Sequence, residues 1–261
     1  MRIATWNVNS VRARLPLVSA FLEKHQPDVL VLQEIKGEDD TFPRAAFEGQ
    51  GYHAEVFGQK AYNGVAILSR EKPYNVLRGL PGDPPDTQAR YLEVTIGGVR
   101  IASLYVPNGN PLDSEKYTFK LAWMDRLTAR ARVLLATEEP VLLAGDFNVI
   151  PTAKDVDDPS GWEHDALYAP PVRAAFRALV NLGYTDALRT LHPDDPRLFT
   201  FWDYKARSWE RDAGIRIDHV LLSPEAADRL TEAHVDRAWR DEPQASDHAP
   251  VIVELSCWAL R

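Results

Sequence analysis

Polar side chains that can bind a metal ion or move a proton stand at the ends of short apolar runs in this sequence. They are carboxylates, carboxamides and one imidazole, namely Asn7, Glu34, Asp146, Asn148, Asp218, Asp247 and His248. Each alone is weak evidence, because a polar residue after a strand is more often a turn residue or a helix cap. Together they are informative, because a sheet brings the ends of its strands to one edge. Oxygen ligands suit a hard cation, so the set favours Mg²⁺, with Mn²⁺ as a substitute, over Zn²⁺.

The apolar runs that carry these residues have the length and β-branched content of strands. Eight are predicted as strands: 3–8, 29–33, 64–69, 91–96, 99–106, 141–145, 217–222 and 251–255. Helical periodicity precedes Pro27, follows Ser114, runs from Pro171 to Gly183 and follows Ser223. Gly97-Gly98 indicates a hairpin, which argues against a purely parallel sheet. Two mixed sheets packed face to face, with helices outside, would bury this many strands.

Composition limits the class of protein further. The chain has 261 residues, of which 45% are hydrophobic, and no repeat or linker divides it, so we expect one domain over residues 1–261. A net charge of −8 argues against bulk attraction to nucleic acid or acidic membrane, so a polyanion would be bound locally. The single Cys257 excludes an intrachain disulfide framework, and the apolar runs are too short to span a membrane. We therefore expect a cytoplasmic protein with no membrane partner.

Seven short motifs run from the first residues of the chain almost to the last. They are WNVNS (6–10), LQE (32–34), NGVAILS (63–69), YVPNG (105–109), GDFNV (145–149), RIDHVLLS (216–223) and SDHAPV (246–251). In this order they resemble the exonuclease III family, the abasic-site endonucleases of the wider endonuclease/exonuclease/phosphatase superfamily. The resemblance implies a four-layer α/β sandwich, a monomer, and Mg²⁺-dependent cleavage of DNA phosphodiesters.

The resemblance also implies how the metal ion is held. Glu34 matches the principal ligand, and Asn7 and Asp247 match positions that complete or flank its coordination. The further candidate ligands are Asp146, Asn148 and His248. The ion would polarise the phosphate and offset charge on the leaving oxygen.

Five residues match positions that act on the phosphodiester itself. Asp146 would position or deprotonate the attacking water, and Asn148 would hold that water or stabilise the transition state. His248 would contact the scissile phosphate, with Asp218 orienting its imidazole. Tyr105 would donate to the phosphate or to the leaving oxygen. His219 adjoins Asp218 but would point to the opposite face of the strand, where we expect an ordinary core or surface role.

Contacts to DNA are implied at four positions. Phe201, Trp202 and Ile217 match an apolar pocket that receives a flipped-out deoxyribose without its base. Ile215 stands where some members have tryptophan, so one wall of this pocket is less aromatic here. Arg90 matches an arginine near the DNA backbone. The implied partner is double-stranded DNA with abasic sites or blocked 3′ ends.

The main hypothesis is a DNA-repair nuclease that hydrolyses the phosphodiester 5′ to abasic sites. The 3′-to-5′ exonuclease and 3′-phosphodiesterase or phosphatase activities are further expectations. One alternative keeps the metal site but acts on RNA or a small molecule, and another is a catalytically silent nucleic-acid binding module. The pocket residues favour DNA, and the joint presence of the polar residues favours an enzyme.

Overall fold

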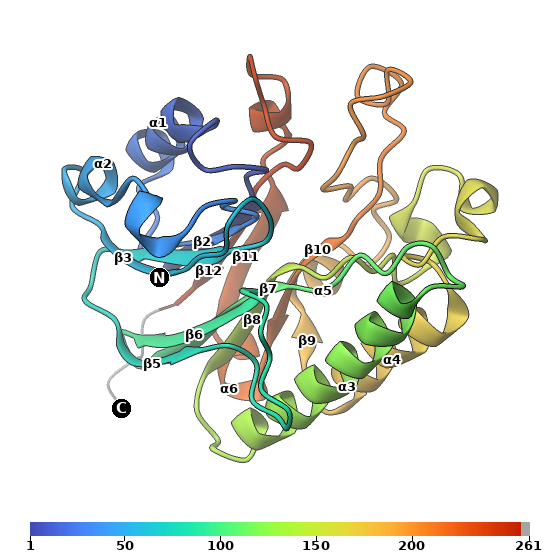
Figure 1. The fold of residues 1–261 in the computed structure, drawn as a ribbon, viewed down its shortest axis with the longest axis horizontal. Helices are drawn as coiled ribbons and strands as arrows, with labels where there is room; N and C mark the ends of the chain where they lie inside the picture. The colour runs from blue at the N-terminus through green and yellow to red at the C-terminus, as the bar shows by residue number, and fades with distance from the viewer. Residues whose placement is uncertain (257–261) are drawn as a thin grey trace.

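Two six-stranded sheets lie one over the other in the computed structural model, which describes residues 1–256 (Figure 1). The first sheet has the order β11-β12-β1-β2-β4-β3, with bounds Leu230–Val235, Val251–Leu255, Arg2–Asn7, Val29–Gln33, Val65–Ser69 and His53–Phe57. The second has the order β5-β6-β7-β8-β10-β9, with bounds Tyr74–Arg78, Tyr91–Ile96, Val99–Tyr105, Val141–Asp146, Asp218–Leu222 and Thr185–Asp186. In each sheet one central pair is parallel, β1 with β2 and β7 with β8, and the other pairs are antiparallel.

Helices cover the outer faces of both sheets. The first sheet is covered by α1 (Leu15–His25) and α2 (Arg44–Glu48), and the second by α3 (Glu115–Leu135) and α4 (Pro170–Asn181) (Figure 1). Shorter helices complete the chain: α5 Ala187–Leu191, α6 Pro224–Ala227, and the 3₁₀ turns Asp39–Thr41, Ala153–Asp155, Pro159–Trp162 and Arg237–Arg240. Within residues 1–256, no helix is both long and apolar enough to cross a bilayer.

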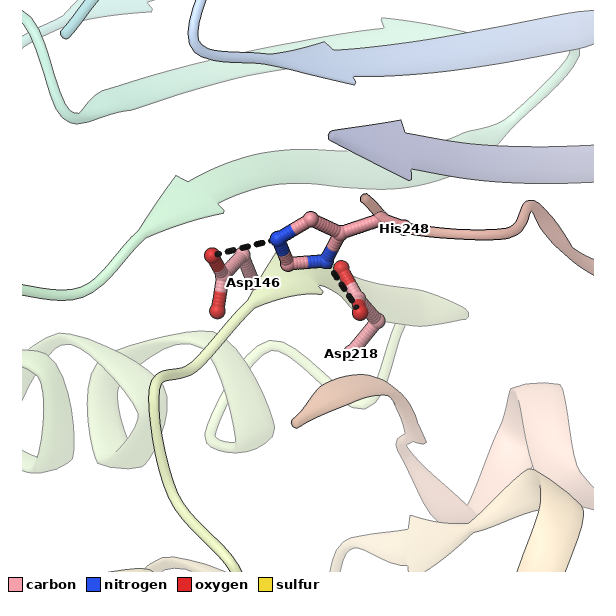
Figure 2. A group of neighbouring side chains, drawn as sticks. All are labelled: Asp146, Asp218 and His248. Carbon is pink, nitrogen blue, oxygen red and sulfur yellow. Dashed lines mark hydrogen bonds and ion pairs between the residues drawn. The ribbon is translucent and has the colours of Figure 1, made fainter. Parts of the chain in front are cut away.

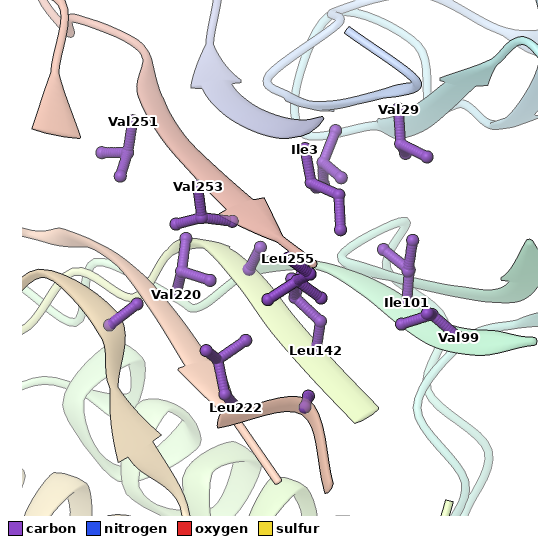
Figure 3. Packing of buried hydrophobic residues seen from close by; sticks show 14 of the residues in the cluster. Ile3, Val29, Val99, Ile101, Leu142, Val220, Leu222, Val251, Val253 and Leu255 are labelled. Carbon is purple, nitrogen blue, oxygen red and sulfur yellow. The ribbon is translucent and has the colours of Figure 1, made fainter. Parts of the chain in front are cut away.

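The central core lies between the two sheets. In β2, Val29 and Val31 face this core, while Leu30 and Leu32 face the helices on the other side. This alternation follows from the period of two along a strand, and it explains why β2 is apolar at both faces. Figure 3 shows side chains of the first sheet packed against Leu142 and other residues of the second. The expected four-layer α/β sandwich is confirmed.

All eight predicted strands are present, and β6 and β7 form the predicted hairpin. The structure adds β3, β5, β9 and β11, which are the edge strands of the two sheets. Edge strands are solvated on one side, as β5 shows with four of its five residues exposed, so they lack the continuous apolar run that marks a buried strand. The short helices α2 and α5 were not predicted either. Cys257, the only cysteine, lies outside the described residues.

Candidate active site

The ends of the central strands gather the predicted polar residues at one edge of the sandwich. Asn7 ends β1 beside the end of β2, which runs directly into Glu34. In the second sheet Tyr105 pairs with Asp146, and Asp146 pairs with Asp218 on its other side. Strand register therefore places these five residues on adjacent strand ends of each sheet.

A buried imidazole lies between two carboxylates at this edge (Figure 2). The Nδ1 atom of His248 is 2.7 Å from Oδ2 of Asp218, and its Nε2 atom is 3.8 Å from Oδ2 of Asp146. Burial opposes charge on His248, but the carboxylates, Asp218 above all, outweigh it and raise the pKa of the imidazole to about 10. His248 is therefore an imidazolium at neutral pH, with one N–H committed to Asp218 and the other directed towards Asp146.

The Asp146 carboxylate is held in place from two sides. Its Oδ2 atom accepts a hydrogen bond from Nδ2 of Asn7 at 3.0 Å, and its Oδ1 atom accepts one from the backbone N–H of Asn148 at 2.8 Å. Burial raises the pKa of Asp146 to about 7; His248 opposes this rise and Asp218 adds to it. A carboxylate with a pKa near neutrality can accept a proton from water more readily than an ordinary one.

Glu34 lies on the other side of Asn7 from Asp146. Its Oε1 atom accepts from Nδ2 of Asn7 at 2.9 Å, and its Oε2 atom is 2.9 Å from Nζ of Lys36. Burial opposes ionisation of Glu34, but these two contacts outweigh it and lower its pKa. Glu34 is thus an ionised carboxylate at the mouth of the cluster.

Asn9 and Lys36 belong to the site, although the sequence pattern did not single them out. Nζ of Lys36 donates to Oδ1 of Asn9 at 2.5 Å, and Nδ2 of Asn9 donates to Oδ1 of Asp247 at 3.1 Å. The two residues therefore link Glu34 to Asp247. Asn9 follows a predicted strand end by one position and Lys36 by three, and this proximity was the only signal in the sequence.

The residues present fit a divalent metal ion. Four carboxyl groups, of Glu34, Asp146, Asp218 and Asp247, meet at one edge, and Oδ1 of Asp218 is buried without a hydrogen-bond partner among the described residues. Asp146, Asp218 and His248 offer ligand atoms within 4.8 Å of one another, but His248 and Asp218 are already hydrogen-bonded to each other. The remaining oxygen donors suit a hard cation. Here Asn7 turns its NH₂ group, not its oxygen, to the carboxylates.

Tyr105 and Arg90 line a groove of about 580 Å³ that opens beside the cluster. Burial, together with Glu34 and Asp146, raises the pKa of Tyr105 well above its usual value, so its hydroxyl stays a donor. The guanidinium of Arg90 stacks 4.8 Å from the centre of the Tyr105 ring. Asn108 also lines the groove and donates to Oδ1 of Asn148 at 3.3 Å; sequence reasoning did not identify it.

The three residues expected to form the abasic pocket are not brought together at the surface. The Phe201 ring is half-buried, 4.9 Å from the imidazole of His248. Ile217 packs beneath it in a small apolar cluster and is 2% exposed. Trp202 is fully buried against Phe199 and Ala249, because consecutive residues of an extended segment point to opposite sides. Of the three predicted contacts, only Phe201 presents surface beside the cluster.

Several non-glycine residues at this edge have left-handed backbone conformations. Their φ values are 45° at Asn9, 50° at Glu34, 53° at Lys36 and 49° at Asn148. Such conformations cost energy, and they persist at functional sites where the surrounding structure enforces them. Their presence among the polar residues of the cluster agrees with the assignment of this edge as the active site.

The chain belongs to the Endonuclease/Exonuclease/phosphatase family, whose model matches residues 4–248. It is 32% identical to exodeoxyribonuclease III of Haemophilus influenzae, over 98% of this chain and 100% of that protein. The fold is similar to that of an AP endonuclease from Archaeoglobus fulgidus, with a TM-score of 0.95 and 36% identity over 98% of this chain and 100% of that one. It is equally similar to a 3′ phosphatase from Neisseria bound to a product DNA hairpin, with a TM-score of 0.95 and 42% identity over the same shares. The resemblance to the exonuclease III family is confirmed.

Proposed function

We propose that this chain is a metal-dependent DNA-repair nuclease that hydrolyses the phosphodiester 5′ to abasic sites. The observation that carries the proposal is the buried arrangement of Asp146, His248 and Asp218. This arrangement lies beside Glu34, at the edge of a groove that Tyr105 lines. Its relatives include enzymes named exodeoxyribonuclease III and AP endonuclease, which supports DNA as the substrate. A cytoplasmic monomer remains our expectation.

The chemistry follows from the charge and hydrogen bonding of each group. Asp146 is the general base that takes a proton from the attacking water, and Asn148, whose N–H holds Asp146, orients that water. The imidazolium of His248, fixed by Asp218, donates to a non-bridging phosphate oxygen as negative charge builds up on it. Tyr105 donates its hydroxyl proton or a hydrogen bond to the departing oxygen.

Glu34 and Asp247 are the residues that would hold Mg²⁺, or Mn²⁺ in its place. Asn7, whose NH₂ group donates to both Glu34 and Asp146, would position these carboxylates. When bound, the ion neutralises charge on the phosphate and on the leaving oxygen. The ionised state of Glu34, maintained by Asn7 and Lys36, prepares it for this role.

A second candidate function is processing of 3′ ends, as a 3′-to-5′ exonuclease and 3′ phosphatase. The specific observation in its favour is that Trp202 and Ile217 are buried, so they offer no wall to a flipped-out abasic sugar. The similar Neisseria 3′ phosphatase supports the same direction. Both functions use the same metal site and the same nucleophilic water, so they differ only in how the DNA is bound.

Two matched duplexes separate the candidates. One carries a single internal abasic analogue and the other a 3′-terminal phosphate, and each is incubated with purified protein and Mg²⁺ or with EDTA. We expect Mg²⁺-dependent incision at the lesion. Release of phosphate from the second duplex without incision of the first would replace the main proposal by 3′-end processing. Absence of metal-dependent turnover on both would overturn the two candidates together.

A further inference from the structure

Two consecutive backbone carbonyls behind the active site are each held by a buried ionisable side chain from a different element. Nζ of Lys120, on α3, donates to the carbonyl of Asn148 at 2.5 Å. Nε2 of His219, on β10, is 2.9 Å from the carbonyl of Val149. Both side chains have 0% of their surface exposed, and neither touches the groove described above. Neither has a role in the reaction proposed so far.

Lys120 joins two loops that carry reacting groups. Besides the carbonyl of Asn148, its Nζ atom donates to the carbonyl of Asn108 at 3.0 Å, three residues after Tyr105. The same loops are joined by Nδ2 of Asn148, which donates to the carbonyl of Val106 at 2.9 Å. Burial lowers the pKa of Lys120 to about 7, with Asp146 opposing. Burying an amine that has only carbonyls as hydrogen-bond partners lowers the stability of the fold. The contribution of Lys120 is therefore the geometry that its hydrogen bonds impose on the two loops.

His219 holds the second carbonyl in one defined protonation state. Its Nδ1 atom lies 3.1 Å from Nη1 of Arg216, which is itself bound to Asp186 at 2.7 Å. A guanidinium can only donate, so Nδ1 must accept and Nε2 must carry the proton that it donates to Val149. The ring is packed against Phe176, 4.7 Å away. The orientation of the imidazole is therefore fixed on every side.

The carbonyls of residues 148 and 149 belong to the turn that aims the reacting groups. Asn148 has a φ of 49°, in the left-handed region, and its N–H binds the Asp146 carboxylate. A rotation of this turn would move both side chains away from the phosphate. We propose that Lys120 and His219 are positioning residues that clamp this turn from α3 and β10. The inference rests on the roles proposed above for Asp146 and Asn148.

A double-mutant cycle tests the Lys120 half of the clamp. The single-turnover cleavage rate at saturating enzyme is measured for the wild type, Lys120→Met, Asn148→Ala and the double variant, on whichever duplex the wild type turns over. We expect Lys120→Met to slow cleavage by roughly 10- to 100-fold, since a displaced reacting group costs rate and not affinity. The dissociation constant for DNA should change by less than about three-fold. In the Asn148→Ala background the same change should cost clearly less than in the wild type, because the part of its effect that displaces the Asn148 side chain is then absent.

The outcomes distinguish failure of the proposed clamp from failure of the proposed function on which it rests. No turnover by the wild type overturns the proposed function and the inference with it, whereas full turnover by Asn148→Ala overturns the role proposed for Asn148 and, with it, the inference. A large loss for Asn148→Ala with an unchanged rate for Lys120→Met overturns the inference alone, and so does an equal cost of Lys120→Met in both backgrounds. The matched control is Arg132→Met, which removes an exposed cation roughly 18 Å further along the same helix and should leave the rate unchanged.

A second pair of variants tests the positioning role of His219. It also tests the proposed clamp if Lys120→Met does not fold. His219→Leu removes the donor to the Val149 carbonyl, and we expect it to slow cleavage by roughly ten-fold. His219→Gln keeps an N–H donor and an acceptor on a side chain of similar length, and should restore the rate to within about three-fold of the wild type. Equal rates for the two variants would overturn the role of His219, because only the hydrogen bonds distinguish them.

Discussion

Acid should destabilise this fold through His219, and replacing that residue by glutamine should remove the effect. Burial, reinforced by the Arg216 guanidinium, lowers the pKa of His219 to about 4, although Asp186 opposes this. An imidazole in the unfolded chain titrates near 6.5. Between these two values the unfolded chain binds a proton that the folded chain does not. The free energy of unfolding must therefore fall as the pH falls through this window.

The size of the effect follows from the same two values. They differ by about 2.5 pH units, which corresponds to about 3 kcal/mol once the window has been crossed completely. Most of this arises above the folded pKa, so about 2 kcal/mol should be lost between about pH 7 and pH 5.

Urea unfolding of the wild type and of His219→Gln at several pH values measures this contribution directly. EDTA is present throughout, so that a metal ion bound only by the folded state adds no pH dependence of its own. Other groups titrate in both proteins, so the informative quantity is the difference between the two profiles. His164→Gln, at an exposed loop position, is the matched control and should follow the wild type. Parallel profiles for wild type and His219→Gln would refute the reasoning, since they would mean that the buried imidazole accepts a proton as readily as an unfolded one.

Three further changes probe the site and the core. Asp146→Asn should lower turnover at least roughly 100-fold by removing the general base, with DNA affinity by fluorescence anisotropy within about three-fold; equal losses of both would indicate a structural role. Glu34→Ala should raise the Mg²⁺ concentration needed for half-maximal cleavage by about ten-fold, and an unchanged titration would count against Glu34 as a main ligand. Glu93→Gln should cost about 3 kcal/mol in urea unfolding, because the fully buried carboxylate is paired with Arg130 and Arg100; a loss below about 1 kcal/mol would contradict this.

The fold and the centre of the site could be predicted because both depend on local pattern. A strand buried on two faces must be apolar along its length, as in β2 and β8, and such runs are visible in the sequence. The polar residue that follows such a run lies where the strand ends, and therefore at the edge of the sheet. Asn7, Glu34 and Asp146 were therefore predicted at one edge, and the structure brings them into hydrogen-bonding contact through Asn7.

The rest of the site depends on packing that no local pattern records. Lys120 sits on a helix face, and only the way α3 lies on the second sheet places its amine beneath Asn148. His219 was predicted to point away from Asp218, and it does, but that face carries the contact to Val149. Trp202 shows the importance of alternation within a motif, because its neighbour Phe201 faces His248 whereas Trp202 faces the core.

The charge of the cluster favours binding of a metal ion over direct binding of the DNA phosphate. Four carboxyl groups lie at this edge, and the cationic groups in contact with them are Lys36 and the imidazolium of His248. A phosphate diester approaching the cluster would meet an excess of negative charge in a partly buried site, where charges are weakly screened. A divalent cation held by these carboxylates would offset this excess of negative charge. By the same reasoning, Asp146→Asn removes one of the repelling groups, so its DNA affinity in EDTA should be at least that of the wild type while its turnover is lost.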